Sequence, residues 1–329
     1  MRILLVRLSA LGDVAQALHV LSTLRARAPD AYIGWLAQDD FASILQGHPQ
    51  LDRLHVYRRR ELKGWVLKPW VLAGFRRLLV ELRGERYDVA LDLQGNLKSG
   101  YLTCWSGARR TVGTGPPLSR EGHGLFVRRR VTPPEGHRLE AYYALLDEVV
   151  GPGPRAHAVL PSEPSHPGAI VLQPGTSAFG AFKRWPPESF AELGDRLADR
   201  LDAPVLVVGR SHDMPLVRTV IANMRHPASN PDTPSLRTLI DLLAGARIVV
   251  AGDTGALHIA GALGVPTLGL FGPKDPEVFG PAGARVRTVR TGVRCSPCAL
   301  RFCPDPVCMT GLTVEQVERE ALALLEEAA

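Results

Sequence analysis

The stretch Asp253-Thr254-Gly255-Ala256-Leu257-His258 places polar side chains and a glycine where ligands commonly bind. Residues 247–251 before it form an apolar run typical of a buried strand, and residues 259–263 after it are typical of a short helix. A Thr-Gly turn between them offers free backbone N–H groups and the positive end of a helix dipole. The sequence therefore predicts a diphosphate site. His258 could donate to a phosphate or a sugar hydroxyl, although a lone histidine on a helix is more often a structural residue. Because Asp253 is acidic, we expect it to cap the helix or order the loop.

A second segment of the same half carries phosphate-binding residue types. Thr176 and Ser177 follow an apolar run that ends at Gln173, and Lys183 and Arg184 come shortly after. The hydroxyl and N–H groups of such a loop can bind a phosphate, and the two cations supply the charge that a leaving diphosphate needs. A basic surface loop is the alternative interpretation.

Asp13 follows the first apolar run, in Ser9-Ala10-Leu11-Gly12-Asp13. We expect it at the start of the first helix, where the dipole stabilises a carboxylate. It is either a general base or an ordinary N-terminal cap, and this segment alone favours the cap.

Further polar groups fall in Asp92-Leu93-Gln94-Gly95-Asn96-Leu97-Lys98-Ser99. Asp92 lies within an apolar run, where a carboxylate needs a partner. Lys98 could be that partner, or its ammonium could face an anionic ligand. A structural ion pair beside a turn explains Asp92 and Lys98 equally well.

The most basic part of the chain, residues 53–86, holds ten Lys and Arg against three acids. Its loop with Arg58, Arg59, Arg60 and Lys63 is our candidate for binding a phosphate-bearing acceptor. Apolar residues between 71 and 82 follow helical spacing, and Trp65 and Trp70 lie among cations. This pattern suits an anionic lipid interface, although a core helix with a solvated basic face is the favoured interpretation.

Four cysteines lie close together near the end of the chain, at Cys295, Cys298, Cys303 and Cys308. A Cys-x-x-Cys pair is a good half-site for zinc, so a structural zinc ion is one interpretation. Two short disulfides and free thiols stay open as alternatives. We expect the remaining cysteine, Cys104, to be a core residue.

The elements that must position these residues alternate between strands and helices, which predicts an α/β fold with parallel sheets covered on both faces. Residues 151–154 and 161–167 are rich in glycine and proline, so we place a linker there. The predicted domains are residues 1–160 and 161–329, two doubly wound domains facing each other across a cleft. A last helix over residues 313–327 either belongs to the second domain or packs back on the first.

Composition limits the function. The chain has 329 residues, 45% of them apolar, and a net charge of +6, which suits phosphates, an anionic membrane or nucleic acid. It has no apolar stretch near the ~20 residues that span a bilayer, and its first apolar run is too short for a signal peptide. We expect a cytoplasmic protein, with peripheral binding to the inner face of the plasma membrane as a further expectation.

Taken together, these motifs resemble glycosyltransferase family 9, the ADP-heptose:lipopolysaccharide heptosyltransferases. The match rests on residues 7–13, 92–99, 183–186, 252–258 and Phe271-Gly272-Pro273-Lys274-Asp275-Pro276, in the family's order. There are departures: Ala256-Leu257 replaces the family's usual Leu-Ser, and the segment between Ser177 and Lys183 looks longer.

The resemblance implies a GT-B fold of two Rossmann-like domains, the first binding the acceptor and the second the nucleotide sugar. It implies inverting, metal-independent transfer of heptose from an ADP-sugar to a lipid-linked, phosphate-bearing sugar, with no cofactor and no catalytic metal. Asp13 would be the base. The residues implied for the donor are Thr176, Ser177, Lys183, Arg184, Asp253, Thr254, Gly255 and His258. Those implied for the acceptor are Arg58, Arg59, Arg60, Lys63, Asp92, Gln94 and Lys98.

Two other function classes compete with this hypothesis. The same fold could use another nucleotide sugar or a glycan acceptor outside lipopolysaccharide. A non-enzymatic nucleic-acid-binding protein would explain the positive charge, but the sequence has no recognisable reader module. An oxidoreductase is disfavoured, because no Gly-x-Gly-x-x-Gly motif follows the first strand.

Overall fold

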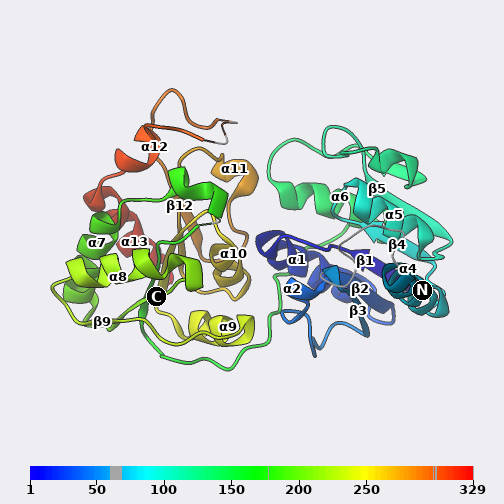
Figure 1. Cartoon of the computed structure of the whole chain (residues 1–329), viewed down its shortest axis with the longest axis horizontal. Coiled ribbons are helices and arrows are strands. Elements are labelled where there is room, and N and C mark those ends of the chain that lie inside the picture. The colour runs from blue at the N-terminus through cyan, green and yellow to red at the C-terminus, as the bar shows by residue number, and fades with distance from the viewer. Residues whose placement is uncertain (60–68, 177, 299, 301, 329) are drawn as a thin grey trace. The chain divides into compact units, whose positions relative to one another are not determined.

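The chain folds into two compact units, Met1–Pro161 and Ser162–Ala329. The structure is a computed structural model, and it describes residues 1–59, 69–176, 178–298, 300 and 302–328. The predicted residues Arg60, Lys63, Trp65 and Ser177 lie outside this description. Figure 1 shows the elements of each unit.

The first unit is built on a parallel sheet with the strand order β3-β2-β1-β4-β5-β6. The central strand β1, Arg2–Val6, has Ile3 through Val6 fully buried, as expected of a parallel strand covered on both faces. The other strands are β2 (Tyr32–Gln38), β3 (Arg53–Tyr57), β4 (Val89–Asp92), β5 (Arg110–Thr114) and β6 (Arg129–Val131).

Helices cover this sheet on its two sides. The helix α4 (Pro69–Gly84) is amphipathic, as predicted, and it buries Val71, Leu78 and Leu82. With α5 (Leu97–Trp105) it packs on the sheet face that carries Leu4 and Val6. The helices α1 (Leu11–Arg27) and α6 (Arg138–Val150) pack against each other. Short helices occur at α2 (Asp39–Ala42) and η1 (His123–Leu125).

The second unit repeats the winding of the first. Its sheet has the order β12-β11-β10-β7-β8-β9, which matches the first sheet when each is numbered from its own first strand. The strands are β7 (Ile170–Gln173), β8 (Val205–Val207), β9 (Ala228–Ser229), β10 (Ile248–Gly252), β11 (Thr267–Leu270) and β12 (Val286–Val289). Both sheets therefore reverse their order once, between β1 and β4 and between β7 and β10. Ligands bind at such switch points in open α/β sheets.

The helices of the second unit are α7 (Pro187–Leu201), α8 (Met214–Asn223), α9 (Leu236–Gly245), α10 (Gly255–Ala262), α11 (Pro276–Phe279), α12 (Val307–Thr310) and α13 (Val314–Ala328), with short turns at η2 (Ala178–Lys183) and η3 (Ser211–Asp213). The N–H of Gln316 donates to the Thr313 hydroxyl at 3.3 Å, so Thr313 caps α13. The buried face of α13, Val314, Val317, Ala321 and Leu324, lies in the core of its own unit with Trp185 and Phe190.

Among the described helices, none is both long enough and apolar enough to cross a membrane.

Candidate active site

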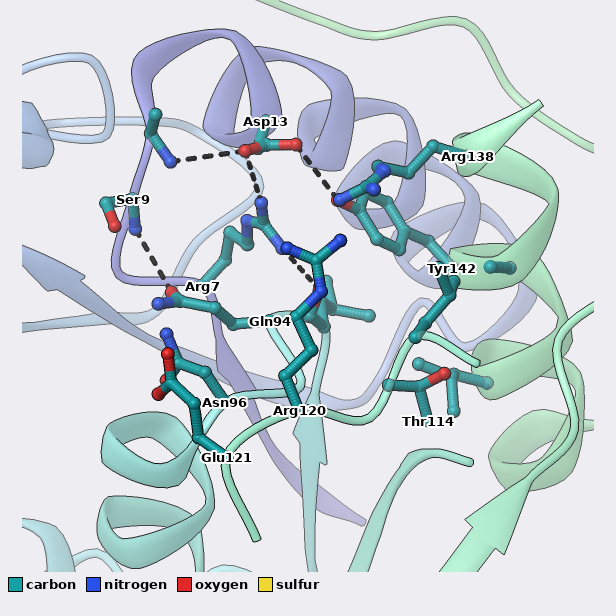
Figure 2. Close-up of a pocket in the computed structure, with 15 residues that line it drawn as sticks. Arg7, Ser9, Asp13, Gln94, Asn96, Thr114, Arg120, Glu121, Arg138 and Tyr142 are labelled. Atoms are coloured by element: carbon teal, nitrogen blue, oxygen red, sulfur yellow. Dashed lines mark hydrogen bonds and ion pairs between the residues drawn. The ribbon is translucent and has the colours of Figure 1, made fainter. Parts of the chain in front are cut away.

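A polar cavity of about 240 Å³ lies in the first unit at the carboxyl ends of β1, β4 and β5. It occupies the switch point of this sheet, and α6 forms its far wall (Figure 2). The side chains that line it are Arg7, Ser9, Ala10, Asp13, Leu93, Gln94, Asn96, Thr114, Leu118, Arg120, Glu121, Arg138, Ala141, Tyr142 and Leu145.

Asp13 is held at the edge of this cavity by two other side chains. It is the third residue of α1, and its Oδ2 accepts a hydrogen bond from the Ala10 N–H at 3.3 Å. The same oxygen lies 2.5 Å from Arg7 Nη2, and the Tyr142 hydroxyl donates to Oδ1 at 3.4 Å (Figure 2). The Asp13 side chain is still 28% exposed, so a substrate hydroxyl can reach it. Asp13 thus serves the start of the helix and also faces the cavity.

Arg7 is an unusually buried cation. Its side chain is 4% exposed, and Nη1 donates to the Leu93 carbonyl at 2.6 Å. Burial alone would lower the pKa of the guanidinium, but the Asp13 carboxylate and Tyr142 outweigh it and raise the pKa. Burial also raises the pKa of Tyr142 to about 12, against the opposing effect of Arg7. Arg7 therefore stays charged and Tyr142 stays a neutral donor at physiological pH.

Gln94 and Asn96 build the neighbouring wall. The side-chain carbonyl of Gln94 accepts from the N–H groups of Leu8 at 2.8 Å and Ser9 at 3.2 Å, which fixes the loop after β1 against the loop after β4. Asn96 caps α5 by accepting from the Ser99 N–H at 3.0 Å. The predicted residue Gln94 is thus in the cavity with Asp13.

Asp92, which we predicted to bind the acceptor, has its carboxylate engaged inside the protein. It is fully buried, and its carboxylate accepts from the N–H groups of Gln94 and Gly95. Its partner is the buried His123, whose Nε2 lies 3.0 Å from Asp92 Oδ2. His123 Nδ1 lies 3.2 Å from the Ser119 hydroxyl, so this network ties the loop of residues 115–126 to the end of β4.

Lys98 is not the partner of Asp92, contrary to one interpretation of the sequence. Its ammonium lies 5.3 Å from the centre of the Tyr57 ring. Burial, together with the charge of Arg59, lowers the pKa of Lys98. Arg58 and Arg59 are exposed directly after β3, and the Arg59 N–H donates to Asp39 at 3.2 Å.

Two arginines that line the cavity, Arg120 and Arg138, were not predicted from the sequence as site residues. Figure 2 shows the Arg120 side chain reaching from its loop into the cavity. Arg120 precedes Glu121 and Gly122, both with positive φ, so the chain turns sharply there. The Glu-Gly turn beside Arg120 was the signal that the sequence offered for this residue. The turn is placed at the cavity by the contact of His123 with Asp92, which are 31 residues apart and share no local pattern.

In the second unit, Lys183 and Asp253 come together at the other switch point. Lys183 Nζ lies 3.0 Å from Asp253 Oδ2, and His258 Nε2 lies 4.0 Å from Oδ1. Burial would raise the pKa of Asp253, but His258 and Lys183 outweigh it and lower the pKa to about 2. Asp253 is therefore the counter-ion of Lys183. It is not the helix cap, because Thr254 holds that position before α10 and accepts from the Leu257 N–H.

Thr254 also joins the two central strands of this sheet. Its hydroxyl donates to Gln173 Oε1 at 2.8 Å, across the switch point from β10 to β7. On the same loop as Gln173, the Thr176 hydroxyl accepts from Arg184 Nε at 3.1 Å, and Arg184 Nη2 lies 3.6 Å from the buried Asp213. Gly255 begins α10. The predicted donor residues that the structure describes thus gather around the amino-terminal end of α10 and the loop after β7.

The family model of "Glycosyltransferase family 9 (heptosyltransferase)" matches residues 75–307, more than two thirds of the chain. This chain belongs to glycosyltransferase family 9. Like the family, it is a glycosyltransferase, as the motifs predicted.

Relatives and solved structures of heptosyltransferases align with most or all of this family 9 chain. It is 29% identical to lipopolysaccharide heptosyltransferase 1 of Pseudomonas aeruginosa, over 99% of this chain and 98% of that one. The same enzyme of Escherichia coli K12 is 29% identical, over 86% and 91% of the two chains. The E. coli heptosyltransferase WaaC with ADP aligns with a TM-score of 0.81 at 24% identity, over 98% and 100%. E. coli ADP-heptose lps heptosyltransferase II aligns with 0.79 at 25%, over 100% of each. The fold is therefore GT-B, with two Rossmann-like units.

The cysteines of this glycosyltransferase are thiols, and within the described part of the chain none is in a disulfide. Burial and the neighbouring thiols of Cys295, Cys298 and Cys303 raise the pKa of Cys308. In the described ranges no three His, Cys, Asp or Glu side chains are arranged to hold a metal ion. The structural zinc ion thus stays a prediction. Cys104 is exposed on α5, so the expectation of a core residue was wrong.

Proposed function

We propose that this glycosyltransferase transfers heptose from ADP-heptose to a sugar of a lipid-linked lipopolysaccharide core. The observation that carries the proposal is the Asp13 carboxylate, held by Arg7 and Tyr142 at a polar cavity on a sheet switch point. The printed names of the relatives support the sugar and the acceptor, since they are lipopolysaccharide heptosyltransferases. A WaaC structure with ADP-2-deoxy-2-fluoro heptose, aligned over all of this chain, supports the donor.

In the proposed reaction, Asp13 takes the proton of the acceptor hydroxyl. The freed oxygen attacks the anomeric carbon of the donor, and the bond from that carbon to the diphosphate breaks. ADP leaves with the electron pair of the broken bond. A single displacement of this kind inverts the configuration at the anomeric carbon. Arg7 and Tyr142 position the base and take no proton from the acceptor.

The donor diphosphate is proposed to bind in the second unit, beside Lys183 and the amino-terminal end of α10. Lys183 and Arg184 supply positive charge, and the first N–H groups of α10 point toward the same region. These groups can stabilise the charge that develops on departing ADP, so the proposed reaction uses no divalent ion. Asp253 keeps Lys183 in place until the diphosphate competes for its ammonium.

The acceptor is proposed to bind in the first unit, where several arginines can bind the phosphate groups of the acceptor. Arg120 and Arg138 line the cavity beside Asp13, and Arg58 and Arg59 are exposed after β3. Arg60 and Lys63 stay candidates for the same role. Arginine suits this task because its planar guanidinium binds phosphate oxygens in pairs. We further propose that a protein with a lipid-linked acceptor contacts the anionic membrane surface peripherally.

The decisive experiment is transfer of heptose from ADP-heptose to a heptose-free lipopolysaccharide core. Asp13→Asn should lower kcat roughly 10²–10⁴-fold, the usual contribution of a general base. ADP affinity, measured by calorimetry, should not change. Near-normal turnover by Asp13→Asn would reject the base, and a preference for UDP- or GDP-sugars over ADP-heptose would reject the donor.

A further inference from the structure

The helix α5 presents an apolar face to solvent. Leu97, Tyr101 and Trp105 follow one another at four-residue spacing and are 46%, 37% and 44% exposed. The remaining exposed residue of this helix is Cys104. The solvent side of a surface helix normally carries charged and polar side chains, so an apolar stripe there indicates a surface that contacts something.

The neighbouring helix α4 adds positive charge to more exposed apolar groups. Trp70, Leu72 and Val80 are 64%, 48% and 62% exposed, and Arg76, Arg77 and Arg83 are exposed between and beside them. The single acid of this helix, Glu81, is engaged by His55 at 2.7 Å and Arg53 at 3.3 Å. The exposed side of α4 is thus apolar and cationic.

Contacts of Arg83 with Trp105 link the exposed sides of the two helices. Arg83 Nε donates to the Trp105 carbonyl at 3.1 Å, and its guanidinium carbon lies 5.5 Å from the Trp105 ring centre. Tyr101 packs against Trp105 and Phe126, with ring centres 5.9 and 6.0 Å apart. We call this surface the α4–α5 face; it comprises Trp70, Leu72, Arg76, Arg77, Val80, Arg83, Leu97, Tyr101 and Trp105.

We propose that the α4–α5 face docks on an anionic phospholipid surface. Tryptophan and tyrosine settle at the level of lipid headgroups, and arginines near them attract anionic lipids. Interfacial helices combine these same apolar and basic residues. A second copy of this chain is the less suitable occupant, because a two-fold contact would set the arginines of one copy against those of the other.

The position of the α4–α5 face relative to the cavity fits this occupant. Leu97, the first residue of the apolar stripe, directly follows Asn96, which lines the cavity beside Asp13. A lipid-linked acceptor could therefore keep its lipid in the membrane under α5 while its sugar reaches the cavity. This part of the inference rests on the proposed function; binding of the face to lipid does not.

Vesicle co-sedimentation of the full chain tests the proposal. The protein should bind vesicles of phosphatidylcholine mixed with phosphatidylglycerol, should bind phosphatidylcholine alone weakly, and should dissociate at high salt. The double variant Arg76→Gln, Arg77→Gln should lower partitioning roughly 30-fold, from the loss of two cations near the surface. Tyr101→Ser with Trp105→Ser should lower it at least as much. The matched controls Arg218→Gln, an exposed arginine of α8, and Val159→Ser should bind like the wild type.

Two further measurements complete the test. Thermal melting and ADP binding should be unchanged in the α4–α5 variants, which excludes misfolding, and brominated lipids should quench tryptophan fluorescence less in the Trp105 variant than in the wild type. Equal binding by variants and wild type would overturn the proposal, as would a concentration-dependent dimer that these substitutions dissolve. Vesicle binding without heptose transfer would reject the proposed function alone, and transfer to detergent-dispersed acceptor without vesicle binding would reject the face alone.

Discussion

Asp13 shows why one residue can satisfy two interpretations of a sequence. At the third position of α1 its carboxylate accepts from the Ala10 N–H, as a structural residue of a helix start does. The same carboxylate meets Arg7 from the end of β1 and Tyr142 from α6 at a cavity. Sequence spacing gives the first contact, but Tyr142 lies 129 residues away.

Substitution of the residues that position Asp13 should affect turnover more than donor binding. Arg7→Lys keeps the charge but loses the second nitrogen, which now holds the Leu93 carbonyl, so we expect kcat to fall roughly 10-fold. Tyr142→Phe removes one weak hydrogen bond and should lower kcat only a few-fold. Steady-state kinetics should show an unchanged KM for ADP-heptose in both variants.

Arg25→Lys provides the control for Arg7→Lys. Arg25 also pairs with a carboxylate, that of Asp52, and with backbone carbonyls, but it lies outside the cavity. Its substitution should leave kcat unchanged. If Arg7→Lys raised the KM for the donor and spared kcat, Arg7 would not be a positioning residue for the base.

At the scale of elements, both sites depend on loops that leave neighbouring central strands. In the second unit, the loops after β7 and β10 are fixed to each other by Thr254 and Gln173, and Asp253 holds Lys183. Because the pKa of Asp253 is lowered to about 2 from an ordinary 3.8, its ionised form stabilises the fold.

The contribution of Asp253 should depend on pH in one direction. It is fully present above about pH 4 and is lost as the pH falls toward 2. The reason is that the unfolded chain protonates this carboxylate near pH 3.8, whereas the folded state does so only near pH 2. Asp253→Asn should therefore be less stable than the wild type by about 2 kcal/mol at pH 7, with a smaller difference near pH 3. Urea unfolding at both pH values measures this, and a difference that does not depend on pH would contradict it.

The packing of β2 against Tyr87 gives a sharper prediction. A β-carbon added at Gly34 would lie 1.9 Å from the Tyr87 hydroxyl oxygen, which is buried and 2.8 Å from His55 Nε2. We expect Gly34→Ala to lower the free energy of unfolding by about 2–4 kcal/mol. Gly84, at the end of α4, has no atom within 4 Å of such a carbon.

Gly84→Ala is therefore the matched control, and it should be neutral or stabilising by up to about 1 kcal/mol. Denaturant unfolding of both variants decides the matter. Equal effects of the two substitutions on the free energy of unfolding would mean that the contact with Tyr87 does not restrict which side chains fit at position 34.

The sequence predicted the central elements better than the edges. The runs that became β1, β4, β7, β10 and β11 are continuous and apolar because these strands are buried on both faces. The strands β3, β5, β6, β9 and β12 were missed, since they lie at or next to a sheet edge and each contains exposed or half-buried residues. The pairing of Asp92 with His123 joins residues 31 apart, so no local pattern could favour it over Lys98.

At the scale of the whole molecule, the two units share one winding, and each has its own core. The predicted donor residues that the structure describes all lie in the second unit, while Asp13 and the cavity lie in the first. The chain can therefore lose one function and keep the other, as two independently packed units permit.

ADP binding should report on this separation. At 100 times its dissociation constant, ADP stabilises the fold that binds it by about 2.7 kcal/mol, which a thermal shift detects. Asp13→Asn should show the same ADP shift as the wild type, and Lys183→Met should show little or none. An ADP shift that disappears in Asp13→Asn would assign nucleotide binding to the first unit.

The bond between Asp92 and His123 matters for redesign of this enzyme. His123 holds the segment from Gly115 to Phe126 to the end of β4, while Arg120 and Glu121 of this segment line the cavity. In the proposed reaction, an exchange of its outward positions as a cassette should therefore change which glycan is accepted. A graft that omitted His123 would leave the buried Asp92 carboxylate without its partner. The exchanged segment would then lose its contact with the end of β4.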